Sequence, residues 1–245
     1  MKEEFKTTDI LGFPFVNTTF SSFMNQIKSR IEQRKNTFII TANPEIVVFA
    51  KKHPKYQNII KSSNYITPDG VGIIKASHIL NDDIPGRISG FDIFLNLLKW
   101  GNANHKSAYF LGAKPNVIND LKTTLNHNYP HLKISGIHDG YFNYDEQIVK
   151  DIQKTQPDMI FIALGYPKQD LFINKYRSIS NGLWIGLGGS FDVLSGNTKR
   201  APQFWINHHI EWFYRLLKEP SRLPRMMALP YFLYLIYQQK EKQRK

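Results

Sequence analysis

Cysteine is absent from this 245-residue sequence, which excludes disulfide bonds, thiolate metal ligands and a cysteine nucleophile. The first residues, MKEEFKTTDILGFPF, carry acidic side chains and contain no long apolar stretch followed by a small-residue cleavage site. We therefore expect no signal peptide, and the lack of cysteine is compatible with a reducing compartment. The cytoplasm is the expected location.

Long hydrophobic runs are missing as well. The longest apolar stretch, at residues 226–237, is interrupted by Pro230, whereas a helix needs about 20 apolar residues to cross a bilayer. We expect no transmembrane helix. Basic residues flank this stretch, which favours an amphipathic segment on an anionic membrane surface. A C-terminal helix packed on the body explains the same pattern, and the sequence leaves both interpretations open.

Two common nucleotide-binding motifs are absent. No G-x-G-x-x-G follows the first expected strand and no G-x-x-x-x-G-K-[ST] occurs, which argues against a Rossmann dehydrogenase and a P-loop nucleotide hydrolase. The histidines lack the spacing of metal ligands, and there is no Asp-x-Asp to hold the divalent ion of a nucleotide sugar. We expect no metal and no cofactor, so arginines and helix N-termini would have to meet any diphosphate charge.

Positive charge is in excess, with a formal net charge of +12, which favours an anionic partner. Residues 211–245 concentrate part of this excess, because they hold eight Lys or Arg residues against three Glu, among many aromatic side chains. We expect no nucleic-acid partner, since the positive residues are not gathered on a recognition helix and no nucleic-acid-binding motif occurs.

Short β-branched runs alternate with segments of helical period, which predicts an α/β fold with a mainly parallel, Rossmann-like sheet flanked by helices. The clearest expected strands are residues 37–40, 64–66, 107–111, 132–137, 158–164 and 182–187. The pattern changes near residue 196, and residues 200–219 suggest one helix that Pro220 ends. We therefore predict an α/β catalytic domain at residues 1–195 and a basic, aromatic, helical appendage at residues 196–245.

Ligands of a parallel sheet bind beyond the carboxyl ends of its strands, where loops lead into helices. In the loop at residues 41–45, the Thr41 hydroxyl and the Asn43 side chain would face the free amides of a helix that starts at Pro44. Plain helix capping by Asn43 is the simpler explanation of that loop alone. In the loop at residues 67–70, the Asp69 carboxylate could act as a general base, although aspartate before glycine is also common turn chemistry.

Three arginines of the appendage, Arg215, Arg222 and Arg225, follow one another at spacings of seven and three residues. On a continuous helix these spacings place them near one face, although Pro220 and Pro224 interrupt the segment. Together they could clamp a diphosphate.

Eight motifs occur in order along the chain: TANPE, TPDGVG, RISGFD, YFLGAKP, GIHDGYF, ALGYPKQD, GLGGSFDVLSGNTKRAP and EWFYRLLKEPSR. In this order and spacing they resemble the successive signatures of the WecG/TagA/CpsF glycosyltransferases, from about residue 8 to about residue 230. The resemblance implies an inverting, metal-independent transferase that moves a sugar from a nucleotide donor to an undecaprenyl-diphosphate-linked sugar. It also implies a protein that is peripheral on the inner face of the cell membrane.

The wall teichoic acid branch of that family resembles this sequence most. There the donor is UDP-N-acetylmannosamine, the acceptor is lipid-diphosphate-linked N-acetylglucosamine, and the new bond is β-1,4. The resemblance thus implies three partners, namely the nucleotide sugar, the polyprenyl-diphosphate-linked acceptor and an anionic membrane surface. A homo-oligomer is compatible with it.

The resemblance also assigns roles to residues. It implies that Asp69 is the general base, that Thr41 and Asn43 contact the reacting sugars, and that Gln169 joins this catalytic group by lining the donor pocket. The donor-binding residues that we expect in the glycine-containing loops are Gly112, Gly165, Gly188, Gly189 and Asp192. The three arginines would reach the diphosphate once the appendage folds over the site as a membrane-docked catalytic lid.

The sequence departs from the family pattern at one motif. Where the family usually shows P-K-Q-E followed by tryptophan, this chain has Asp170, Leu171 and Phe172, which affects the donor most. Another donor, such as N-acetylmannosamine uronic acid or a hexose for capsule or exopolysaccharide, is the first alternative. A non-catalytic membrane-associated scaffold is the alternative of another class, and the intact candidate residues argue against it.

Overall fold

The structure is a computed structural model that describes residues 5–198, 202, 205 and 228–244. An eight-stranded sheet forms its centre, with the strand order β1-β2-β4-β3-β8-β7-β5-β6. All neighbouring strands run parallel except β1 and β2, which form an antiparallel hairpin at one edge. The strands are β1 (Thr7–Ile10), β2 (Phe13–Val16), β3 (Thr37–Ala42), β4 (Tyr65–Pro68), β5 (Ser107–Gly112), β6 (Lys133–His138), β7 (Met159–Ala163) and β8 (Leu183–Gly186).

Helices cover both faces of this sheet, and each face has its own hydrophobic core. One face carries α2 (Pro44–Lys52), α3 (Pro54–Ser62), α4 (Val71–Ile79), α7 (Glu146–Thr155), α8 (Lys168–Tyr176) and α13 (Ala228–Gln243). The other carries α1 (Phe20–Glu32), α5 (Gly90–Ala103), α6 (Pro115–Asn128) and α9 (Ser190–Leu194). A short 3₁₀ turn at Arg177–Ile179 follows α8. The predicted α/β class and mainly parallel sheet are confirmed, and all six expected strands are present.

The helices that follow β3 and β8 lie on opposite faces of the sheet, although the two strands are neighbours. The chain leaves β3 into α2 on one face, whereas it leaves β8 into α9 on the other. In open α/β sheets, such a reversal of the path opens a crevice at the carboxyl edge, and ligands bind there. The topology therefore points to the loops after β3 and β8 as the centre of a site.

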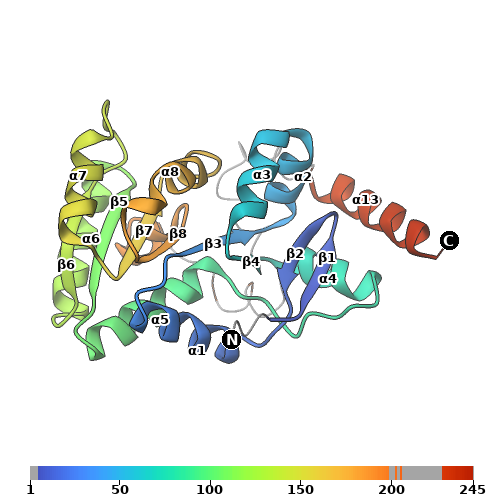
Figure 1. The fold of residues 1–245 in the computed structure, drawn as a ribbon, viewed down its shortest axis with the longest axis horizontal. Helices are drawn as coiled ribbons and strands as arrows, with labels where there is room; N and C mark the ends of the chain where they lie inside the picture. Colours follow the sequence, from blue (N-terminus) through green and yellow to red (C-terminus); the bar gives the residue numbers. More distant parts are fainter. Residues whose placement is uncertain (1–4, 199–201, 203–204, 206–227, 245) are drawn as a thin grey trace.

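The C-terminal helix expected within residues 196–245 is present as α13, and it packs on the α/β body (Figure 1). Phe232 and Ile236 are fully buried against the core that contains α2 and α4. Near the other end, the Gln239 side chain accepts a hydrogen bond from the Leu11 amide at 2.8 Å and donates one to the Asp9 carbonyl at 2.9 Å. These contacts fasten α13 to the β1–β2 hairpin. The helix predicted at residues 200–219 lies outside the described residues except for residues 202 and 205.

Among the residues that the structure describes, no helix combines the length and the apolar character that crossing a bilayer demands.

Candidate active site

The loop after β3 carries two of the candidate residues. Asn43 caps α2, because its side-chain oxygen accepts a hydrogen bond from the Ile46 amide at 2.9 Å, and Pro44 occupies the first helical position. The capping interpretation is therefore correct for the oxygen of Asn43. The side-chain amino group is the end that can still donate to a ligand. Thr41 precedes this cap at the carboxyl end of β3, in register with Thr67 of β4.

Asp69 lies beside these residues, in the loop that follows the neighbouring strand β4. Its amide donates to the Ala42 carbonyl at 3.0 Å, which holds the loops after β3 and β4 together. The Asp69 carboxylate accepts from the amide of Gly90 at 3.5 Å, at the N-terminus of α5. The same N-terminus touches Thr41, because a Cβ on Gly90 would lie 3.1 Å from the Thr41 hydroxyl oxygen. Asn43 also lies next to the loop of Asp69, because its Cβ is 3.9 Å from the position that a Cβ on Gly70 would take.

The N-terminus of α5 was not part of the predicted site. Ser89 caps this helix by accepting from the Asp92 amide at 3.2 Å, and its hydroxyl donates to the Asp92 carboxylate at 2.6 Å. Arg87 forms an ion pair with the same carboxylate at 3.7 Å, so a cation lies close to the start of α5. The amide of Ile88 donates to the Pro68 carbonyl at 2.9 Å and joins this segment to the end of β4. The motif RISGFD was visible in the sequence, but nothing in it indicated this contact with Asp69.

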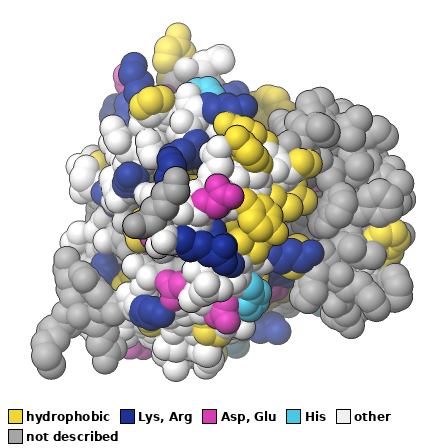
Figure 2. Space-filling view, turned by 90° about the vertical axis from the view of Figure 1, so that its right-hand side faces the viewer, with side chains coloured by type: hydrophobic (Ala, Val, Ile, Leu, Met, Phe, Trp, Pro, Cys, Tyr) yellow, Lys and Arg dark blue, Asp and Glu magenta, His cyan; other side chains and the backbone are white. Residues whose placement is uncertain are grey.

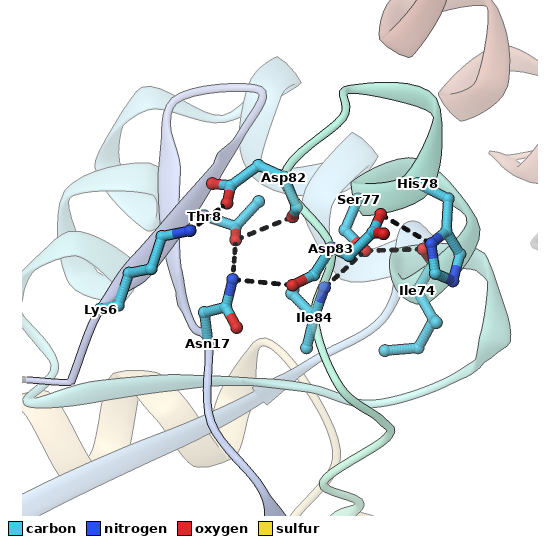
Figure 3. A network of polar contacts seen from close by, with 9 residues as sticks. All are labelled: Lys6, Thr8, Asn17, Ile74, Ser77, His78, Asp82, Asp83 and Ile84. Atoms are coloured by element: carbon cyan, nitrogen blue, oxygen red, sulfur yellow. Dashed lines mark hydrogen bonds and ion pairs between the residues drawn. The ribbon is translucent and has the colours of Figure 1, made fainter.

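The segment between α4 and α5 is anchored far from the site (Figure 3). The Thr8 hydroxyl donates to the Asp82 carbonyl at 3.1 Å, and the Asn17 side chain donates to the Asp83 carbonyl at 2.9 Å. Lys6 adds an ion pair with Asp82 at 2.6 Å. These bonds attach the segment to the β1–β2 hairpin, and they fix the start of the path that delivers the N-terminus of α5 to Asp69.

Gln169 lies on α8 and packs over the end of β8, the strand next to β3. Its side chain is only 7% exposed, and its oxygen accepts a hydrogen bond from the Gly188 amide at 2.9 Å. One end of the side-chain amide is therefore bound to the loop after β8. Gln169 and Gly188 therefore lie together at the end of β8. This strand is the neighbour of β3, whose loop carries Thr41 and Asn43.

Asp170 follows Gln169 and is 2% exposed. The Tyr56 hydroxyl, from α3, donates to its carboxylate at 2.6 Å. Burial raises the pKa of the Asp170 carboxyl to about 7, although hydrogen bonds from Tyr56 and Gln169 act in the opposite direction. Burial also raises the pKa of the Tyr56 phenol, and the adjacent Asp170 charge adds to that shift. No sequence motif indicated this pair, because its members lie on different helices.

A second polar contact crosses the same region. The hydroxyl of Tyr166, in the loop between β7 and α8, forms a hydrogen bond with the carboxylate of Glu45 in the first turn of α2. The Phe49 ring packs edge-on against Tyr166 and Tyr56, with centroid distances of 5.5 and 5.3 Å. The peptide bond between Tyr166 and Pro167 is cis. These contacts connect the loop after β7 to the helix that follows β3.

The expected donor-binding glycines all lie at the carboxyl edge, with different surroundings. Gly112 ends β5 against β7, and a Cβ there would lie 2.4 Å from the Ala163 carbonyl, so close backbone approach requires glycine. A Cβ on Gly165 or Gly188 would meet no atom of the described residues within 4 Å outside its own chain neighbours, which leaves room for a ligand. Gly189 precedes the short helix α9, whose first turn contains the last expected residue, Asp192.

The remaining candidates are Arg215, Arg222 and Arg225, and they lie outside the described residues. In the part of the chain that the structure does describe, no three His, Asp or Glu side chains are grouped so that they could hold a metal ion.

In a mainly parallel α/β sheet, polar loops at a reversal of the path are where a ligand binds, which defines the class as an α/β protein with a ligand site at its carboxyl edge. Residues 8–245 match the profile of the glycosyl transferase WecG/TagA/CpsF family, and the chain belongs to that family. A relative from Bacillus subtilis strain 168 is 41% identical over 97% of this chain and 94% of its own length. Relatives from Bacillus spizizenii strain W23 and Staphylococcus aureus strain NCTC 8325 are 39% and 37% identical over 93% and 97% of this chain, and 90% and 94% of their own lengths. All three are named N-acetylglucosaminyldiphosphoundecaprenol N-acetyl-beta-D-mannosaminyltransferase.

Proposed function

We propose that this glycosyltransferase moves N-acetylmannosamine from UDP-N-acetylmannosamine to undecaprenyl-diphosphate-linked N-acetylglucosamine, forming a β-1,4 bond in wall teichoic acid linkage-unit synthesis. The observation that carries the proposal is the convergence of Thr41, Asn43 and Asp69 with the N-terminus of α5 at the carboxyl edge. Relatives that match more than nine-tenths of the chain have names that print the acceptor and the transferred sugar, and these names support the proposal. The UDP carrier and the β-1,4 linkage rest on the family resemblance of the motifs.

Asp69 is the general base of the proposed reaction. Its carboxylate takes the proton from the 4-hydroxyl of the acceptor sugar while that oxygen attacks the anomeric carbon of the donor. The bond between the anomeric carbon and the diphosphate oxygen breaks, and UDP leaves with the electron pair, so the configuration at that carbon inverts. The hydrogen bond from Gly90 and the backbone bond to Ala42 hold Asp69 in place, so little reorganisation precedes the attack.

Thr41 and Asn43 orient the sugars in this proposal. The Thr41 hydroxyl and the Asn43 amino group are neutral hydrogen-bonding groups beside Asp69, and such groups suit sugar hydroxyls. The N-termini of α2 and α5 meet at the same place, and their free amides favour a diphosphate charge nearby. The acceptor and the base are thus assigned to the β3–β4 side, whereas the donor nucleotide is assigned to the loops of Gly112, Gly165, Gly188, Gly189 and Asp192.

Arg215, Arg222 and Arg225 supply the remaining positive charge in the proposal. The described chain resumes at Ala228, and the next residue packs close to the site, since a Cβ on Gly72 would lie 3.2 Å from Leu229 and 2.5 Å from Pro44. Arg225 precedes Ala228 in the sequence with two residues between them. We assign these arginines to the departing diphosphate, which needs a cation as its negative charge develops.

The membrane contact is assigned to the outer face of α13. Tyr231, Tyr234 and Tyr237 are 42%, 57% and 56% exposed, and spacings of three residues place them along one side of the helix. Lys52 lies over the Tyr231 ring at 5.1 Å. Figure 2 looks onto the end of the molecule where α13 lies and shows hydrophobic side chains gathered among Lys and Arg. Amphipathic tyrosines with adjacent cations suit an anionic interface, and we assign residues 196–245 as the membrane-contacting appendage of the catalytic domain at residues 1–195.

Nucleotide release tests the proposal. Purified protein is incubated with a short-chain lipid-diphosphate-N-acetylglucosamine and a panel of nucleotide sugars in EDTA, with Asp69→Asn and the control Asp151→Asn on α7 alongside. We expect UDP release from UDP-N-acetylmannosamine for the wild type and the control, and a loss of at least about 100-fold in Asp69→Asn. Release from another nucleotide sugar would replace the donor and the pathway. No release from any donor would leave a non-catalytic scaffold.

A further inference from the structure

We propose that Asp170 is a positioning residue of the transfer reaction, which orients the Gln169 side chain together with Tyr56 and thereby fixes the backbone of the loop after β8. The proposal rests on the proposed function for the reaction that it serves. It goes beyond that function because Asp170 itself touches neither sugar nor diphosphate, and because Tyr56 lies on a helix without any candidate residue.

The two oxygens of the Asp170 carboxylate have different neighbours. Oδ2 accepts the 2.6 Å hydrogen bond from Tyr56. Oδ1 lies over the end of β8, where a Cβ on Gly186 would be 2.9 Å away. The Gln169 amino group occupies the same space, 2.4 Å from that Cβ position. Asp170 and Gln169 therefore meet over a glycine that leaves no room for a side chain.

This arrangement decides which way the Gln169 amide points. The Gly188 amide needs an acceptor, so the oxygen of Gln169 must face it, at 2.9 Å. The amino group then faces Asp170, which must accept. An ionised Asp170 accepts hydrogen bonds from both Gln169 and Tyr56 through its two oxygens. In a protonated Asp170 one of these oxygens carries the proton and becomes a hydrogen-bond donor. The charge state of Asp170 thus affects the loop after β8 through the side-chain amide of Gln169, which binds the Gly188 backbone.

The loop that receives this constraint lies at the centre of the site. Its Leu187 amide donates to the Ile162 carbonyl at 2.7 Å, and the Ser190 hydroxyl donates to the Leu187 carbonyl at 2.7 Å. Gly188 lies between these anchored residues, and its amide is held by Gln169. A shift of this peptide changes the wall of the crevice next to the loop of Thr41 and Asn43, and a misplacement of about 1 Å can cost a hundredfold in rate.

A buried carboxylate is a costly way to fill a protein core, which argues for a specific role. No Lys or Arg of the described part of the chain pairs with Asp170, so its charge depends on Tyr56 and Gln169. The other titratable groups that face the pair are Tyr166, from the loop before α8, and Glu45 of α2, which Tyr166 contacts. An apolar residue would pack here without desolvating a charge, but it could not hold the Gln169 amide in one orientation.

The test compares Asp170→Asn, Asp170→Glu and Tyr56→Phe with the wild type, using a donor that the wild type turns over. We expect kcat to fall at least tenfold in Asp170→Asn, while Asp170→Glu keeps most of it because the carboxylate is retained. The wild-type kcat should rise with a midpoint near pH 7 toward a plateau at higher pH, and this limb should be absent in Asp170→Asn. In Tyr56→Phe the limb should move to higher pH, because a hydrogen bond to the ionised carboxylate is lost.

Asp158→Asn is the matched control. Asp158 is a half-buried carboxylate at the opposite edge of the sheet, where it accepts from the Ser107 amide at 2.8 Å and pairs with Arg34. Its variant should lose stability and keep the wild-type kcat and pH limb. If Asp170→Asn behaves in the same way, or if Tyr56→Phe leaves the limb unmoved, the positioning role is refuted.

Hydrogen exchange separates this proposal from the proposed function. Peptides that contain residues 187–190 should exchange faster in Asp170→Asn than in the wild type, whereas peptides of α6 should not change. This readout needs no substrate. Unchanged exchange would overturn the proposal even if the donor assignment holds, and faster exchange would support it even if another donor replaces UDP-N-acetylmannosamine.

Discussion

Replacing Asp170 with asparagine is expected to change how the stability of the protein depends on pH. The pKa of Asp170 is raised from 3.8 to about 7 by burial, so the folded protein holds a proton that the unfolded chain releases between these values. The free energy of unfolding of the wild type should therefore fall as the pH rises through this window, by about 1.4 kcal/mol per pH unit. Asparagine does not titrate, and the contribution disappears in the variant.

The magnitude follows from the width of the window. Between pH 5 and pH 8 the wild type should lose about 3 kcal/mol relative to Asp170→Asn, because the full slope applies up to about pH 7 and flattens as the folded-state carboxyl ionises above it. For a chain of this size, that corresponds to roughly 5–10 °C in Tm. Thermal unfolding of both proteins at several pH values measures the difference, in which the titration of histidines cancels. A Tm difference that stays constant between pH 5 and pH 8 would show that Asp170 is ionised in the folded protein throughout.

Three further changes test other parts of the structure. Gly186→Ala places a methyl group on the Gln169 side chain and should cost about 1–3 kcal/mol in urea unfolding and lower kcat; wild-type values would show that the packing relaxes freely. Phe232→Ala empties a fully buried position and should lower the free energy of unfolding by about 3–5 kcal/mol. Tyr234→Ala, on the exposed face of the same helix, should change the free energy of unfolding by less than about 0.5 kcal/mol and weaken sedimentation of the protein with anionic vesicles. Arg225→Ala should lower turnover of the lipid-linked acceptor without changing Tm, and full turnover would remove it from the diphosphate site.

Local signals in the sequence account for much of the fold. Asn43 followed by Pro44 marked the start of α2 correctly, because capping depends on residues within one turn. The inner strands of the parallel sheet were visible for a similar reason, since β3, β5, β7 and β8 are almost entirely buried and appear as short apolar runs. The β1–β2 hairpin was missed. Pro14 lies within β2 and argues against a strand, yet β2 pairs with β4 only at Phe15, beyond the proline.

The contacts that assemble the site could not be predicted from the sequence. The bond between Gly90 and Asp69 joins residues on different elements, and it depends on how the segment between α4 and α5 is anchored to the β1–β2 hairpin. Tyr56 and Asp170 are separated by 114 residues. Neither pair has a characteristic spacing, because the distance along the chain between packed elements is set by the loops and helices in between. Candidate residues could be named from their loops, but their partners could not.

The apolar stretch at the C-terminus was open to two interpretations, a helix packed on the body and a segment on the membrane surface. The two are compatible. Phe232 and Ile236 lie four residues apart and are buried in the body, whereas Tyr231 and Tyr234 lie three apart and remain exposed. Both faces of α13 are apolar or aromatic, so the stretch had no clear amphipathic pattern in the sequence. Because the buried face and Gln239 fix the helix on the body, the tyrosine face is held at a constant position relative to Asp69. If that face meets the membrane as proposed, the rigid docking of α13 sets the height of the general base above the lipid surface from which the acceptor must arrive.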